Sequence, residues 1–122
     1  MISQGTTRAK QSLLRELDRN FQQYFHTNLH EVIHELRVHH VDITSDPAPD
    51  ELIQVIDQSR ILDFVDAPTM LELRDTVHRV REGTFGVCVA CKRRISAQTL
   101  EVEPNAKLCR SCSRRVVRSG LA

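Results

Sequence analysis

Tryptophan is absent from this sequence, and aromatic residues make up only 4% of its 122 residues. Large aromatic side chains are therefore scarce, which argues against a single large globular core. No apolar run approaches the roughly 18 residues needed to cross a bilayer. Met1–Lys10 also lacks the apolar stretch of a secretory signal. We therefore expect a cytoplasmic chain with no membrane partner.

Catalytic signatures are also missing. The sequence shows no Ser/His/Asp arrangement, no glycine-rich phosphate loop and no nucleophile elbow. Its carboxylates are spread over turns and helix-forming segments, with no pairing of the kind that general acid–base catalysis needs. With 40% apolar and 27% charged residues, the composition favours long amphipathic helices over a compact β-sandwich. We therefore do not expect an enzyme.

The net charge of +1 hides a strong separation of charge along the chain. Residues 41–75 hold nine acidic residues against two basic ones, a net charge of −7. Residues 83–122 hold eight basic residues against two acidic ones, a net charge of +6. This separation indicates two surfaces with different partners, although each charge taken singly is also typical of an ordinary solvated face.

Two segments of equal length, residues 8–40 and residues 50–82, have the periodicity of amphipathic helices. Between them, the sequence Thr44–Asp50 (TSDPAPD) has the turn and N-cap residues that end one helix and begin another. Pro68 should either kink the second segment or begin a new helix in its first turn. The positions of the stripe recur at steps of three and four: Leu17, Phe21, Phe25, Leu29, Val32 and Leu36, then Leu52, Val55, Ser59 and Leu62, then Met70, Leu73, Val77 and Val80.

We predict a mainly α-helical fold in which residues 8–82 form an antiparallel helical hairpin, or coiled coil, with its turn near residues 41–50. Residues 1–7 are expected to be disordered. Each arm would be roughly 50 Å long at about 1.5 Å per residue, so the acidic turn would lie far from the C-terminal part. The alternative is a short bundle that folds back at Pro68 and scatters the acidic residues over a compact surface.

Four cysteines form two C-x-x-C pairs in the last third of the chain, separated by the segment from Lys92 to Leu108. This spacing is typical of a structural zinc site. Four thiolates complete a tetrahedron and leave no open position for a substrate, so we expect one structural Zn²⁺. Residues 83–122 are thus predicted to form a small four-cysteine zinc-finger module with a short basic C-terminal helix. The expected ligands are Cys88, Cys91, Cys109 and Cys112.

Other interpretations of the C-terminal part and of one histidine stripe stay open at this point. A dithiol redox protein of the thioredoxin type would need a βαβ context, which the sequence lacks. A basic zinc module can also act as an adaptor that binds protein or nucleic acid, although few aromatic residues are interleaved with its basic ones. His26, His30 and His34 are each four residues apart and form a weaker candidate for a second metal site.

The stretch GTFGVCVACKRRISAQTLEVEPNAKLCRSC, residues 83–112, resembles the zinc-finger signature of the DksA/TraR family of bacterial transcription regulators. The resemblance covers about a quarter of the chain and is specific, because positions other than the cysteines also agree. These positions are Gly83, Phe85, Gly86, Ile95, the Leu100-Glu101 step, Pro104 and Leu108.

The resemblance implies a regulator that binds bacterial RNA polymerase directly and does not bind DNA. In this family a coiled coil enters the secondary channel of the polymerase, and acidic residues at its tip approach the active centre, often together with the alarmone ppGpp. RNA polymerase is therefore the expected partner, and ppGpp is a candidate ligand. The family's tip motif has two aspartates three residues apart. Here the tip candidates are Asp46 and Asp50, four apart, with Asp42 and Glu51 as weaker ones.

Overall fold

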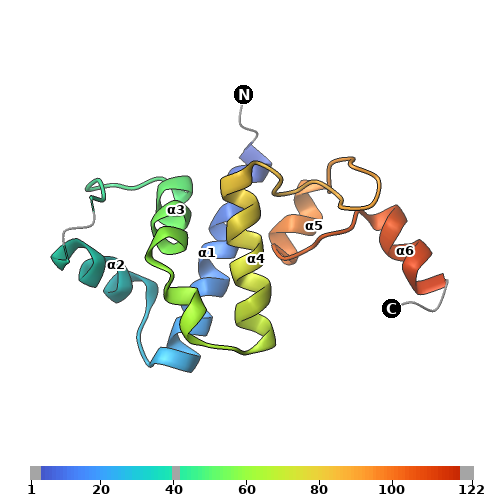
Figure 1. Cartoon of the computed structure of the whole chain (residues 1–122). Helices are drawn as coiled ribbons and strands as arrows, with labels where there is room; N and C mark the ends of the chain where they lie inside the picture. The colour runs from blue at the N-terminus through green and yellow to red at the C-terminus, as the bar shows by residue number, and fades with distance from the viewer. Residues whose placement is uncertain (1–3, 40–41, 119–122) are drawn as a thin grey trace.

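The computed structural model describes residues 4–39 and 42–118. Within these ranges the chain folds into helices and loops, with a single isolated bridge between Val87 and Arg94, so the expectation of a mainly helical protein is confirmed (Figure 1). None of the described helices is both long and apolar enough to cross a membrane. The helices are α1 (Gln4–Phe25), α2 (Leu29–Val38), α3 (Pro49–Ser59), the 3₁₀ helix η1 (Ile61–Phe64), α4 (Pro68–Glu82), α5 (Ala97–Val102) and α6 (Arg110–Arg118).

The two ends of the chain and the start of the expected turn are only partly described. Residues 1–3 of the segment expected to be disordered lie outside the described ranges, whereas residues 4–7 form the start of α1. Residue 41 of the expected turn and residues 119–122 of the expected C-terminal module also lie outside these ranges.

The first expected arm is two helices rather than one. α1 stops because His26 adopts a left-handed φ of +54°, which interrupts a right-handed helix. Asn28 then begins α2 as its N-cap, and its side-chain oxygen accepts a 2.8 Å hydrogen bond from the Glu31 amide. Asp18 secures the turn by accepting a hydrogen bond from the Leu29 N–H at 2.7 Å. Local capping therefore ends a helix that the apolar periodicity alone would continue.

The second expected arm is divided as well. α3 ends at Arg60, which has a left-handed φ of +60°, and η1 follows directly. Pro68 lies in the first turn of α4, where its missing N–H has no helical partner to lose. Of the two outcomes considered for Pro68, the structure shows the new helix.

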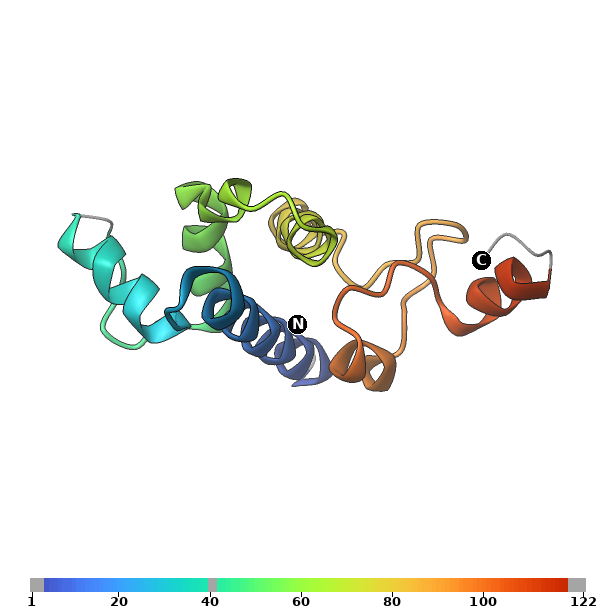
Figure 2. The ribbon, with the colours of Figure 1, turned by 90° about the horizontal axis from the view of Figure 1, so that it is seen from below.

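The structure does not confirm the long two-armed hairpin, because α1 packs against both α3 and α4 in a short bundle (Figures 1 and 2). The breaks at His26 and Arg60 divide the chain into short helices that can pack around one core. The apolar face of each helix is buried against the helices that the turns place beside it. Full burial of one large apolar side chain contributes about 1.5–3 kcal/mol. The buried core residues are Leu13, Leu14, Leu17, Phe21, Val32, Ile53, Ile56, Leu62, Met70, Leu73 and Val77.

A second, smaller core joins the N-terminal part of α1 to the cysteine-containing segment. Ala9 is fully buried there. One turn later, the Ser12 hydroxyl donates a 2.6 Å hydrogen bond to the carbonyl of Glu101 on α5. Because α1 contributes to both cores, it connects the bundle to the C-terminal module. The other buried members of the second core are Cys88, Ile95, Leu100 and Cys112.

The acidic turn is connected to the N-terminal part of α1. Asp50, in the first turn of α3, forms a 2.7 Å ion pair with Lys10 of α1. Lys10 directly follows Ala9, which packs beside the cysteines. The start of α3 is therefore held against α1, and the turn is not the free tip of a two-armed rod.

Candidate metal centre

The first cysteine pair is presented by a tight loop after α4. Gly86 has a φ of +79°, a conformation that favours glycine, and its carbonyl accepts a 2.8 Å bond from the Ile95 N–H. Inside the loop, the Cys88 N–H donates to the Arg93 carbonyl at 2.8 Å, and the Lys92 N–H donates back to the Cys88 carbonyl at 3.0 Å. These backbone bonds hold the C-x-x-C segment as a closed knuckle.

The second cysteine pair is positioned by the start of α6. Cys109 directly precedes the helix, and Cys112 lies in its first turn. The Ser113 N–H donates to the Cys109 carbonyl at 2.9 Å, which closes that turn. A further bond of 2.9 Å, from the Val89 N–H to the Lys107 carbonyl, connects the first knuckle to the residues just before the second.

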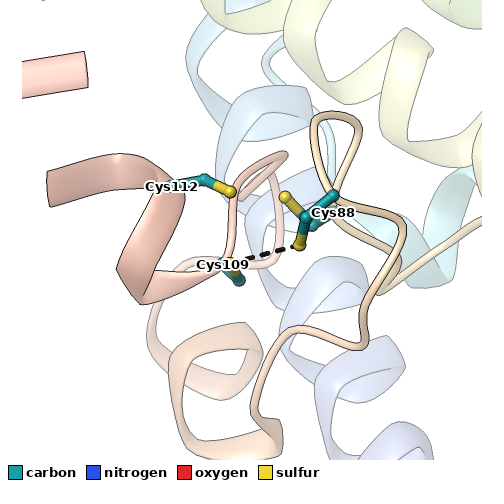
Figure 3. Close-up of side chains that lie close together, drawn as sticks. Cys88, Cys109 and Cys112 are labelled. Carbon is teal, nitrogen blue, oxygen red and sulfur yellow. Dashed lines mark hydrogen bonds between the residues drawn. The ribbon is translucent and has the colours of Figure 1, made fainter. Parts of the chain in front are cut away.

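The four cysteine sulfurs converge on one point. All four Sγ atoms lie within 4.8 Å of one another, and the Sγ atoms of Cys91 and Cys109 are 3.7 Å apart. A tetrahedral zinc ion with Zn–S bonds of about 2.3 Å would separate its sulfurs by about 3.8 Å. All four are free thiols, with Cys88 and Cys112 buried and Cys91 exposed. Figure 3 shows the side chains of Cys88, Cys109 and Cys112 gathered between the loop and α6. The cluster can therefore hold one metal ion.

The cluster makes the four thiols unequal. Hydrogen bonds from the backbone N–H groups of Cys109 and Cys91 lower the pKa of Cys88 to about 6. A backbone N–H bond from Cys112 lowers the pKa of Cys109. Hydrogen bonds with the sulfurs of Cys109 and Cys88, together with burial, raise the pKa of Cys112 to about 12. A cation bound among the sulfurs would favour the ionised form of all four thiols.

The acidic turn residues are separate from this cluster. Asp42 and Asp46 are exposed, and none of the described ion pairs or hydrogen bonds involves either side chain. Asp50 pairs with Lys10, as described above. Glu51 accepts a 2.7 Å hydrogen bond from the Thr44 N–H and so shapes the turn before α3.

The histidine stripe is not a site in this structure. His26 stands in the break between α1 and α2, whereas His30 and His34 lie on α2, and all three are exposed. Among the described residues, the four cysteines are the single group of three or more potential metal ligands that lie this close together.

Sequence reasoning missed a charged hollow of about 840 Å³ between the α3–η1 segment and α4. Asp57 lies at its edge with a side chain only 6% exposed, paired with Arg81 at 2.8 Å and with His78 at 3.4 Å. Asp63 binds Arg60 and Arg74 across the same hollow. Arg60 and Asp63 are only three residues apart, but Arg74 is 11 residues from Asp63 and Arg81 is 24 residues from Asp57, so no local spacing could have predicted these longer-range pairs.

Comparison with known proteins returned no matching family model, curated protein or solved structure. The residues of the cysteine module and their geometry are therefore the features that indicate a function.

Proposed function

We propose that this chain is a zinc-stabilised regulator of the DksA/TraR type that binds bacterial RNA polymerase. The observation that carries the proposal is the convergence of four sulfurs within 4.8 Å, in the segment that resembles the family's signature. Zinc is the proposed metal because Zn²⁺ accepts four thiolates in a closed tetrahedral site. Such a site is structural, so the metal would hold the module's shape and take no part in chemistry.

The other positions of the resemblance support the proposal, because each helps to build the module. Gly83 ends α4 with a left-handed φ of +79°, and Gly86 has the same φ beside Leu100. Left-handed backbone and close approach both favour glycine. Four apolar positions pack in the second core and one proline is buried: Phe85, Ile95, Leu100 and Leu108, with Pro104.

In this proposal the acidic turn before α3 is the part that approaches the polymerase's secondary channel and active centre. Asp46 is exposed and unpaired among the described residues, so its charge is available to a partner. Asp50 must exchange its ion pair with Lys10 for a contact on the polymerase. The turn lies beside α3 and the cysteine module lies beyond α4, on opposite sides of α1 (Figures 1 and 2), so only the turn is proposed to enter the channel.

The test is a pull-down with purified core RNA polymerase, followed by measurement of promoter-complex lifetime with and without ppGpp. Wild-type protein should bind and change the lifetime, and the double variant Asp46→Asn with Asp50→Asn should bind but lose most of that effect. A matched control, Glu72→Gln with Glu82→Gln, removes two exposed charges from α4 and should behave as wild type. Absence of polymerase binding, or an unchanged lifetime with the double variant, would rule out this mechanism.

A further inference from the structure

Most cations of the helical bundle are neutralised by carboxylates. Lys10 pairs with Asp50 at 2.7 Å and Arg81 with Asp57 at 2.8 Å. Arg60 and Arg74 share Asp63 at 3.0 and 3.2 Å. Lys107 of the cysteine module also belongs to this group, since its Nζ lies 3.2 Å from Asp75 of α4. Most, but not all, of the positive charge on this part of the molecule is therefore paired with carboxylates.

The arginines on the outer side of the cysteine module have no such partners. All are exposed, and within the described ranges none forms an ion pair with a carboxylate. The two acidic residues of the module, Glu101 and Glu103, pair with none of them. We call this set the arginine face: Arg93 and Arg94 from the first knuckle, with Arg110, Arg114 and Arg115 from α6.

The arginine face is concave. A hollow of about 550 Å³ lies beside the cysteine cluster, and four of the five arginines line it together with Ser96, Gln98 and Ser111. Figures 1 and 2 show α6 leading away from the bundle, on the far side of the module from α1 and α4. Apart from cysteines, every lining residue is a potential hydrogen-bond donor.

The negative charge of a zinc–thiolate centre would not cancel the positive charge of the arginine face. A zinc ion bound by four thiolates has a formal charge of −2, whereas the arginine face carries five positive charges. Guanidinium groups bind phosphate oxygens in a bidentate manner and are always charged. An unbalanced set of arginines around a polar hollow is thus complementary to a polyanion.

We propose that the arginine face binds the phosphate backbone of duplex nucleic acid without reading its sequence. A protein partner is disfavoured because the hollow has no aromatic or aliphatic anchor, which protein interfaces need at their centre. Single strands are disfavoured because no aromatic side chain lines the hollow for bases to stack on. This inference goes beyond the proposed function, because it adds a contact with nucleic acid to the proposed contact with the polymerase.

The test is the binding of a fluorescein-labelled 20-base-pair DNA duplex of mixed sequence to the full zinc-loaded chain, measured by anisotropy at increasing salt. Neutralising four phosphates predicts a slope of about −3.6 in log K against log salt, at about 0.9 per phosphate. Affinity should then fall about 100-fold between 50 and 200 mM salt. A duplex of unrelated sequence should bind equally, an RNA duplex should bind with a similar slope, and a single strand should bind less.

Matched charge variants decide whether the arginine face is responsible. Arg93→Gln with Arg94→Gln should weaken binding about tenfold at 50 mM salt and reduce the slope by about 1.8. Arg15→Gln with Arg19→Gln removes the same charge from exposed positions of α1 and should leave both values unchanged. Zinc content and circular dichroism must be the same for all proteins compared.

Three results would overturn the inference: no duplex binding at 50 mM salt, equal losses in the two variants, or tighter binding of single strands than of duplex. The assay contains no polymerase, so its outcome is independent of the pull-down that tests the proposed function. A chain that binds polymerase but not DNA would contradict this inference and leave the proposed function intact.

Discussion

Asp63 accepts hydrogen bonds from two arginines, from Arg60 Nε at 3.0 Å and from Arg74 Nη1 at 3.2 Å. The bond from Arg60 is the largest of the effects that place the pKa of Asp63 below the ordinary value of 3.8. Arg60 is also the left-handed residue that separates α3 from η1. The ionised carboxylate therefore helps to hold one of the two breaks that divide the expected hairpin.

We predict that Asp63→Asn lowers thermal stability modestly at pH 7, because the folded state holds this carboxylate more strongly in its ionised form than the unfolded state does. A lowered folded pKa gives stability that is fully present above pH 3.8 and is lost as the pH falls through the folded pKa. The difference in Tm between wild type and variant should therefore shrink toward zero below pH 3.8.

Asp66→Asn is the control for this measurement, because Asp66 is exposed and has no partner among the described residues. Acid also releases thiolate-bound metal, so the quantity to compare is the difference between proteins in the same buffer. A difference that stays constant from pH 7 to pH 3, or that also appears with Asp66→Asn, would contradict the prediction.

At the scale of elements, the junction between α4 and the first knuckle depends on two glycines with the same φ of +79°. A Cβ atom at Gly83 would meet nothing within 4 Å, whereas one at Gly86 would lie 3.1 Å from the Leu100 Cδ1 atom. Leu100 is buried in the second core beside the cysteines. A substitution at Gly83 therefore introduces backbone strain alone, whereas one at Gly86 introduces backbone strain and a steric clash.

We predict that Gly83→Ala destabilises the protein by about 1–2 kcal/mol, the cost of a left-handed residue that carries a Cβ. Gly86→Ala should lower the free energy of unfolding further, because Leu100 must also move. Only Gly86→Ala should weaken metal binding, since the displaced leucine packs beside Cys88 and Cys112. Urea unfolding and competition with a chromogenic zinc chelator measure the two effects. Equal free energies of unfolding and equal zinc affinities for the two variants would be inconsistent with this packing.

At the scale of the whole molecule, α1 belongs to two cores of different origin. Its C-terminal part packs with α3 and α4, in a core that contains no metal ligand. Its N-terminal part packs on the cysteine module through Ala9 and through the bond from Ser12 to Glu101. Small metal modules commonly unfold when the metal is removed, so the two parts of α1 should respond differently.

We predict that chelation of the metal raises amide hydrogen exchange in residues 85–112 and also in residues 8–12 of α1. Residues around Phe21, Ile53 and Leu73 should stay protected, because their core does not include the cysteines. Hydrogen exchange with mass spectrometry measures both regions in one sample, and restoring zinc should reverse the change. Unfolding of the whole chain on chelation, or unchanged exchange in residues 8–12, would show that α1 does not divide in this way.

The cysteine cluster is the part of the candidate site that local sequence spacing could predict. Two residues between the members of each pair bring the sulfurs to the same side of a short loop or helical turn, whatever the rest of the chain does. The divided arms were harder to predict, because the apolar steps of three and four continue across residues 26 and 60. Asn28 was a usable signal, since it is a preferred N-cap residue.

The sequence by itself determined that the chain is mainly helical, that four cysteines can gather into one cluster, and that its charge is divided along its length. These properties follow from periodicity, spacing and composition, which act over a few residues. The tertiary structure alone decided that α1, α2, α3, η1 and α4 share one core, that Lys10 neutralises Asp50, and that the arginine face has no carboxylate partner among the described residues. An apolar stripe or a charge does not encode which distant residue will face it, because that choice depends on how the turns orient the helices.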